Sequence, residues 1–185
     1  MKTFDQIKTL ITLTQASRKN KQADAGKCLN LIITRILNLK KGNKIFFLGN
    51  GGSASIASHM TVDFLKNAEI PAISFNDPSI ITCISNDLGY EKVFEKPIQV
   101  LAQKNDIVFA ISSSGKSKNI LNAALAAKSK GCFLITLSGF NPGNPLRKLG
   151  DVNFYSPSHA YGDVESVHLI ICHNIADSVI KQKNG

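Results

Sequence analysis

The sequence contains 185 residues, 43% of them hydrophobic, which allows one substantial core but is short for two catalytic domains. The formal net charge of +9 suits an anionic partner, but the lysines are not interleaved with aromatic residues and match no nucleic-acid motif, so nucleic acid is not expected. Neither a run of about 18 apolar residues nor a leader segment with a cleavage site is present, so we expect a cytoplasmic protein with no membrane partner.

Apolar residues at helical spacing begin the chain and predict two helices before any strand. The first strand is predicted at 44–48, a mostly apolar run typical of a strand buried on both faces of a parallel sheet. After it, predicted helices and strands alternate. The helices are at 53–66, 79–85, 90–101, 118–130 and 164–181, and the strands at 71–75, 106–111, 132–137 and 152–155.

This alternation predicts an α/β protein with a three-layer, doubly wound, mainly parallel five-stranded sheet of the flavodoxin-like kind and extra N-terminal helices. We expect a single domain over residues 1–185, with the N-terminal helices in 1–40 and the α/β core in 41–185. No internal repeat or interdomain linker is recognisable in the sequence.

In such sheets the ligand lies beyond the carboxyl ends of the strands, so the loops after the first and third strands are candidate binding sites. The first loop contains Gly49, Asn50, Gly51 and Gly52. Its glycines allow positive φ and a close approach of a ligand to the backbone. The helix that follows supplies free N–H groups and the positive end of its dipole, which favour an anion.

The second loop contains Ser112, Ser113, Ser114 and Ser117 around another helix start. Hydroxyls and backbone amides together can satisfy the several acceptor oxygens of a phosphate. The simpler alternative is a serine N-cap. One serine suffices for a cap, so the run of serines favours phosphate binding.

Two other phosphate-binding motifs match the sequence less well. The run 115–117 matches the end of a P-loop, but Ala110 stands where that motif requires glycine. The run 49–54 fits the permissive form of the dinucleotide fingerprint, which keeps a nicotinamide or flavin enzyme as a minor alternative.

Titratable residues are grouped on two predicted helices. His59 and Asp63 are four residues apart on one helix, so they share a face and could hold one proton network or one metal ion. On the C-terminal helix, His168 lies about 60° to one side of Glu165 and His173 about 80° to the other, so one histidine is expected to share a site with it. The alternative for each residue is a purely structural role, with its hydrogen bonds made within the fold. The apolar neighbours of His173 also suit a core histidine.

These residues form an ordered series that resembles the motifs of the phosphoheptose (sedoheptulose-7-phosphate) isomerases in the sugar isomerase (SIS) domain family. The resemblance covers nearly the whole chain. It is carried by 49–53, His59, Asp63, 85–87, 112–117, Glu165 and His173.

The resemblance implies isomerisation of sedoheptulose 7-phosphate to D-glycero-D-manno-heptose 7-phosphate through an enediol, supplying heptose for a surface polysaccharide such as lipopolysaccharide or capsule. It implies that the substrate is contacted by Asn50, Gly51, Gly52, Asp63, Asn86, Asp87, Ser112, Ser113, Ser114, Ser117 and Glu165. It also implies Asp63 and His173 as the catalytic acid and base, and a homotetramer with sites shared between subunits. The implied metal is zinc, held by His59, Asp63, Glu165 and His173.

Two residues depart from the pattern of the family. Asp63 stands where glutamate is usual, which shortens the reach of the carboxylate, and Glu165 stands where glutamine is usual, which adds a negative charge. The stretch 161–164 is also one residue shorter than in typical members. These departures leave two alternatives open, namely an isomerase of a different ketose phosphate and a non-catalytic regulator that binds a phosphosugar.

Overall fold

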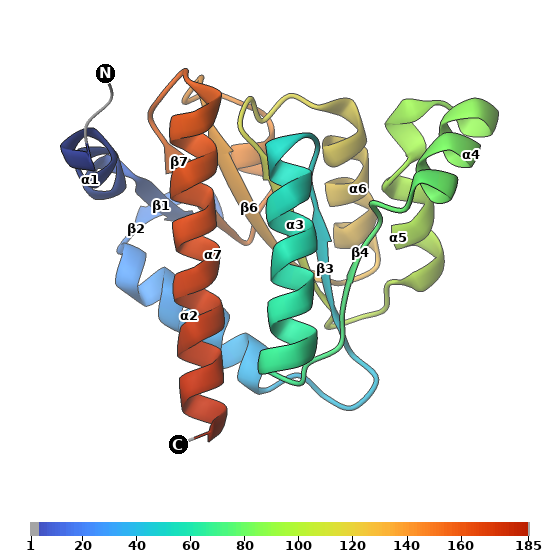
Figure 1. Ribbon diagram of the computed structural model, residues 1–185, viewed down its shortest axis with the longest axis horizontal. Helices are drawn as coiled ribbons and strands as arrows, with labels where there is room; N and C mark the ends of the chain where they lie inside the picture. Colours follow the sequence, from blue (N-terminus) through green and yellow to red (C-terminus); the bar gives the residue numbers. More distant parts are fainter. Residues whose placement is uncertain (1–3, 185) are drawn as a thin grey trace.

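A computed structural model describes residues 4–184 and contains one mixed sheet covered by helices on both faces (Figure 1). Five neighbouring strands of this sheet are parallel. They are β3 (Ile45–Leu48), β4 (Ala72–Ser74), β5 (Ile107–Ser112), β6 (Phe133–Gly139) and β7 (Val152–Ser156). The order β7-β6-β5-β3-β4 is that of a flavodoxin-like sheet, so the predicted five-stranded parallel core is confirmed.

A hairpin extends this sheet to seven strands. Strands β1 (Gln15–Arg18) and β2 (Lys21–Ala23) pair antiparallel with each other, and β1 pairs antiparallel with β7. They follow helix α1 (Phe4–Leu13) and precede helix α2 (Ala25–Leu37), so the expectation of two helices before any strand is wrong. The hairpin strands are short and largely polar, and they lack the apolar run by which the other strands were recognised.

One face of the sheet is covered by α2, α3 (Gly52–Val62) and α7 (Tyr161–Asn184), and α1 packs against α7 (Figure 1). The opposite face is covered by α5 (Glu95–Leu101) and α6 (Lys118–Ser129). Alternate residues of the central strands enter the two cores. Phe47 stacks on Phe109 at 4.8 Å in the first core, whereas Phe46 lies 5.8 Å from Phe75 in the second. The all-buried apolar runs of β3 and β5 are therefore explained by helices on both sides.

Short helical segments connect these elements. A π-helical turn, Asp63–Asn67, extends α3, and a 3-10 turn, Tyr90–Lys92, joins α4 (Pro78–Leu88) to α5. A second 3-10 turn, Leu146–Lys148, precedes β7. Helix α4 begins with a cap in which the Asp77 carboxylate accepts the Ser79 N–H, and it buries none of its residues. No helix between residues 4 and 184 is both long and apolar enough to cross a membrane.

Candidate active site

The glycine loop and the serine loop lie beside each other at the carboxyl edge of the sheet. The first follows β3 and the second follows β5, and these two strands are paired in parallel. The chain winds to opposite sides of the sheet from this point, which is where ligands bind in open α/β sheets. The sequence named both loops as candidate binding sites, and the pairing of β3 with β5 brings them together.

The two loops enclose a cavity of about 360 Å³ that α7 closes on one side. Its lining consists of small polar residues together with Tyr161 and Glu165 from the start of α7. The lining residues are Asn50, Gly51, Gly52, Ser53, Ile111, Ser112, Ser113, Ser114, Ser117, Tyr161 and Glu165. Eight of the predicted substrate contacts therefore share one cavity. They are Asn50, Gly51, Gly52, Ser112, Ser113, Ser114, Ser117 and Glu165.

The glycines of the first loop are required by its geometry. Gly51 has a φ of +55°, in the left-handed region that L side chains rarely adopt, and it is the N-cap of α3. A Cβ atom at Gly52 would collide with the carboxylate of Glu165, so the absence of a side chain lets this carboxylate lie against the loop. No side chain caps α3, which leaves the first-turn N–H groups facing the cavity without that partner.

The serine loop presents hydroxyls that the protein itself uses little. Ser112 Oγ lies 3.3 Å from Ser117 Oγ and accepts the Gly115 N–H at 3.2 Å. Ser113 Oγ is buried and has no hydrogen-bond partner among residues 4–184. Ser117 occupies the N-cap position of α6, yet its side chain makes no cap hydrogen bond. The N-cap alternative therefore does not account for these serines, and the unpartnered hydroxyl of Ser113 favours an anion.

Two residues that sequence reasoning missed hold Asn50 in place. The Asn119 and Asn50 side-chain amides exchange two hydrogen bonds of 2.9 and 3.0 Å, and Tyr90 Oη donates to Asn50 Oδ1 at 3.0 Å. Asn119 is buried in the first turn of α6, which places it between the two loops. A buried asparagine one turn after a serine loop is a signal that could have been read from the sequence. Tyr90 offered none.

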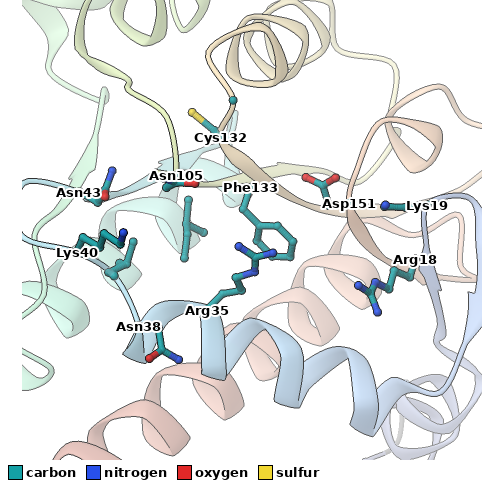
Figure 2. A pocket seen from close by; sticks show the side chains of 13 residues that line it. Arg18, Lys19, Arg35, Asn38, Lys40, Asn43, Asn105, Cys132, Phe133 and Asp151 are labelled. Atoms are coloured by element: carbon teal, nitrogen blue, oxygen red, sulfur yellow. The ribbon is translucent and has the colours of Figure 1, made fainter.

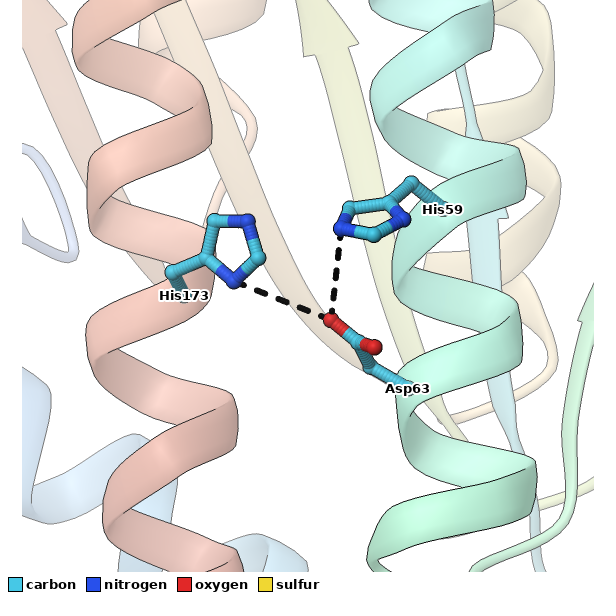
Figure 3. Close-up of side chains that lie close together, drawn as sticks. All are labelled: His59, Asp63 and His173. Atoms are coloured by element: carbon cyan, nitrogen blue, oxygen red, sulfur yellow. Dashed lines mark ion pairs between the residues drawn. The ribbon is translucent and has the colours of Figure 1, made fainter.

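The predicted acid and base residues lie together on neighbouring helices (Figure 3). Asp63 Oδ2 is 3.6 Å from His59 Nε2 and 3.7 Å from His173 Nδ1, and the two imidazole rings are 5.1 Å apart. His59 and Asp63 follow one face of α3 into its π-helical turn, and His173 comes from α7. The sequence alone could not predict that α3 packs against α7, and this packing brings the three residues together.

This group has the donor set of a divalent metal site. One ligand atom from each of His59, Asp63 and His173 lies within 4.8 Å of the others. Two imidazole nitrogens and one carboxylate oxygen match the three protein ligands of a catalytic zinc ion, whose fourth position is left for water or substrate. Glu165 is not part of this close group, and its carboxylate lies over Gly52 instead.

Glu165 nevertheless connects the two halves of the site. It lines the loop cavity and also a second cavity of about 400 Å³ that continues past His59. Gly52 is shared by both cavities as well. A ligand with its phosphate among the serines would therefore extend along Glu165 toward His59.

The remaining candidates lie elsewhere. Asn86 and Asp87 are exposed on α4, where the Asn86 amide donates to Asp87 at 2.8 Å, and neither lines the loop cavity. His168 is fully buried, and burial lowers the pKa of its imidazole to about 4. Its Nε2 faces the Ser138 carbonyl oxygen at 3.2 Å, so this nitrogen carries the proton of a neutral ring. His168 is thus the core histidine, and His173 is the one in the site.

Comparison with known proteins shows the family of this chain. A family model described as SIS domain matches residues 5–139. The phosphoheptose isomerase of Cytophaga hutchinsonii is 39% identical over 164 residues, which are 85% of this chain and 84% of that protein. The chain belongs to the phosphoheptose isomerase group of SIS-domain proteins.

The fold of this SIS-domain chain is also similar to those of solved structures. A phosphoheptose isomerase from Francisella tularensis superposes with a TM-score of 0.81 at 27% identity, covering 96% of this chain and 92% of that one. The phosphoheptose isomerase from Neisseria gonorrhoeae gives a TM-score of 0.77 at 28% identity, with 83% and 86% of the two chains covered.

Proposed function

We propose that this SIS-domain chain is an aldose–ketose isomerase that converts sedoheptulose 7-phosphate to D-glycero-D-manno-heptose 7-phosphate. The observation that carries the proposal is the meeting of Asp63 and His173, from two helices, next to His59. His59 lines a cavity that shares Gly52 and Glu165 with the loop cavity, where the Ser113 hydroxyl has no partner among residues 4–184. The named relatives, phosphoheptose isomerases, support the heptose as substrate.

Binding begins at the serine loop. The phosphate accepts hydrogen bonds from the hydroxyls of Ser113 and Ser117 and from the first-turn N–H groups of α3 and α6. The sugar chain then runs past Glu165 toward His59 and Asp63, along the two connected cavities. The phosphate thus fixes the register of the sugar, and the carbonyl end meets the titratable group.

The reaction transfers protons between two neighbouring carbons. One of Asp63 and His173 removes a proton from C1 of the ketose, and the other donates a proton to the oxygen at C2, which gives a 1,2-enediol. A proton is then returned to C2 while the hydroxyl at C1 loses its proton, which yields the aldose. Asp63 lies within 4 Å of both histidines, so a proton gained by the carboxylate can pass to an imidazole.

A zinc ion fits the donor set and would be held by His59, Asp63 and His173, with Glu165 as a further ligand if α7 adjusts. When bound, such an ion supplies Lewis-acid polarisation of the sugar oxygens. The proposal includes a cytoplasmic homotetramer that supplies heptose for a surface polysaccharide such as lipopolysaccharide or capsule. Helix α4 supports the oligomer, because it exposes Ile80 and Leu88 and buries none of its residues.

Turnover of ketose phosphates by the purified chain tests the proposal. We expect sedoheptulose 7-phosphate to be converted faster than fructose 6-phosphate, and metal analysis to find one zinc ion per chain. Turnover of another ketose phosphate alone would favour a changed substrate, whereas binding without any turnover would favour the phosphosugar-binding regulator.

Matched variants separate chemistry from binding. Asp63→Asn and His173→Ala should lower turnover by about 10³-fold while sugar-phosphate binding at the serine loop persists. Asp177→Asn, an identical change at an exposed position on α7, should leave turnover unchanged.

A further inference from the structure

A second cavity lies at the opposite, amino edge of the sheet, far from the serine loop. It has a volume of about 480 Å³ and is formed where α2, the β1–β2 turn and the starts of β5 and β6 meet (Figure 2). It is lined by Arg18, Lys19, Arg35, Asn38, Leu39, Lys40, Asn43, Asn105, Ile107, Gly131, Cys132, Phe133 and Asp151. None of these residues has a role in the proposed isomerisation.

Four cationic side chains surround this cavity, namely those of Arg18, Lys19, Arg35 and Lys40. None of the four forms an ion pair with a carboxylate in the part of the chain that the structure describes. The lining carboxylate, Asp151, accepts the Leu134 N–H at 2.9 Å. Four like charges around one hollow repel each other, and an anion in the hollow would relieve that repulsion.

The cations are placed at both ends of the cavity. Arg18 and Lys19 lie at one end and Lys40 lies at the other, beside Asn38 and Asn43 (Figure 2). Between them the Arg35 guanidinium lies over the ring of Phe133, with 5.1 Å from its central carbon to the ring centroid. This stacking restricts the guanidinium in the middle of the cavity and leaves its N–H donors available.

The turn that carries Lys19 is also unusual. Arg18 pairs with Lys21, so Lys19 and Asn20 form a two-residue hairpin turn, and both have positive φ, +47° and +64°. Asparagine or glycine is favoured in such turns, whereas a lysine strains the backbone. The Lys19 N–H donates to the Asp151 carbonyl oxygen at 3.2 Å, which holds this strained residue at the rim of the cavity.

We infer that this cavity binds an elongated anion with a phosphate at each end, such as a sugar bisphosphate. Arg18 and Lys19 bind one phosphate, Lys40 binds the other, and Arg35 contacts the connecting part of the ligand. A monophosphate would reach one end only. A nucleoside diphosphate, whose phosphates are adjacent, would likewise leave one cationic end without a partner.

Calorimetric titration with three probes tests this inference, using fructose 1,6-bisphosphate, fructose 6-phosphate and ADP. These titrations use the Ser114→Glu variant, because a carboxylate among the serine hydroxyls repels phosphate from the serine-loop cavity. The wild-type chain, in which both cavities can bind phosphate, is titrated for comparison. We expect the bisphosphate to bind once per chain and at least about tenfold more tightly than the other two probes, since charge-assisted hydrogen bonds at the second end are lost with them.

The variants Arg18→Ala and Lys40→Ala should each weaken bisphosphate binding by about tenfold or more. Lys41→Ala is the matched control, because Lys41 is exposed and next in sequence to Lys40 but does not line the cavity, and binding should change by less than about twofold. All three side chains are exposed, so the fold should tolerate their removal. The inference would be overturned if the bisphosphate did not bind saturably, or if it bound no more tightly than fructose 6-phosphate or ADP. It would also be overturned if Lys40→Ala and Lys41→Ala had equal effects.

Discussion

The cavities at the two edges of the sheet offer an anion different partners. At the carboxyl edge the loop cavity is lined by hydroxyls, glycine backbone and a carboxylate, and no lysine or arginine between residues 4 and 184 lines it. At the amino edge the cavity is lined by four cations and by no serine or threonine of the described chain. Fixed N–H groups and hydroxyls orient one phosphate by geometry, whereas the four cations act mainly through electrostatic attraction. The first arrangement suits catalysis and the second suits binding alone.

The largest expected effect is on the rate of catalysis, which we assign to the carboxyl edge alone. Asp63→Asn removes the carboxylate that joins the two histidines, and general acid–base catalysis contributes about 10²- to 10⁴-fold, so we expect kcat to fall by about 10³-fold. The KM should change far less, because Asp63 does not line the phosphate cavity. Steady-state kinetics measure both values. A variant that kept more than a tenth of wild-type kcat would remove Asp63 from the mechanism.

Stability below neutral pH should depend on His168, which packs beneath the carboxyl edge. Burial lowers the pKa of this imidazole to about 4 from 6.5, so between these values the unfolded chain takes up a proton that the folded chain does not. The free energy of unfolding should therefore fall as the pH drops from 6.5 to 4, by about 3 kcal/mol in total. Urea unfolding at several pH values measures it, and His168→Leu should show a flatter profile. Identical pH profiles for the two proteins would contradict this account.

A smaller effect should follow from filling the gap between the glycine loop and α7. Gly52→Ala places a methyl group against the Glu165 carboxylate, so this flexible side chain must turn away from the loop. Because displacements of about 1 Å can cost catalysis about 10²-fold, we expect kcat/KM to fall by about 10- to 100-fold.

The smallest effect concerns ionic strength. Raising the salt concentration from about 0.05 to 0.3 M should change the KM for the sugar phosphate by less than about threefold, because uncharged donors hold the phosphate. Bisphosphate binding at the amino edge should weaken by more than about tenfold over the same range. Parallel titrations would measure both. Equal salt sensitivity at the two edges would remove the contrast between them.

Much of the fold could be predicted from local patterns. The apolar runs of β3 and β5 and the glycine and serine loops after them give the sheet class and the edge at which a ligand binds. The β1–β2 hairpin escaped prediction because its stability comes from pairing with β7, a contact over more than a hundred residues, and not from an apolar pattern of its own.

The site was predicted only in part, because it too depends on contacts between residues that are far apart in the sequence. Helical spacing puts His59 beside Asp63, but it cannot say which histidine of α7 faces them. The apolar neighbours of His173 even suggested a core position, whereas the fully buried residue is His168. Helix packing decides this, because His168 faces the sheet and His173 faces α3. The structure brings His59, Asp63 and His173 together, and the roles of all the site residues stay predictions.

The central claim is proton transfer at the Asp63–His173 pair on a sugar phosphate held by the serine loop. Proton NMR of sedoheptulose 7-phosphate with the purified chain in D2O tests it most directly. The account predicts conversion to the aldose phosphate, with solvent deuterium entering at the carbon beside the carbonyl, and neither change with Asp63→Asn. Absence of both conversion and deuterium entry with the wild-type chain, under conditions where the sugar phosphate is bound, would contradict it.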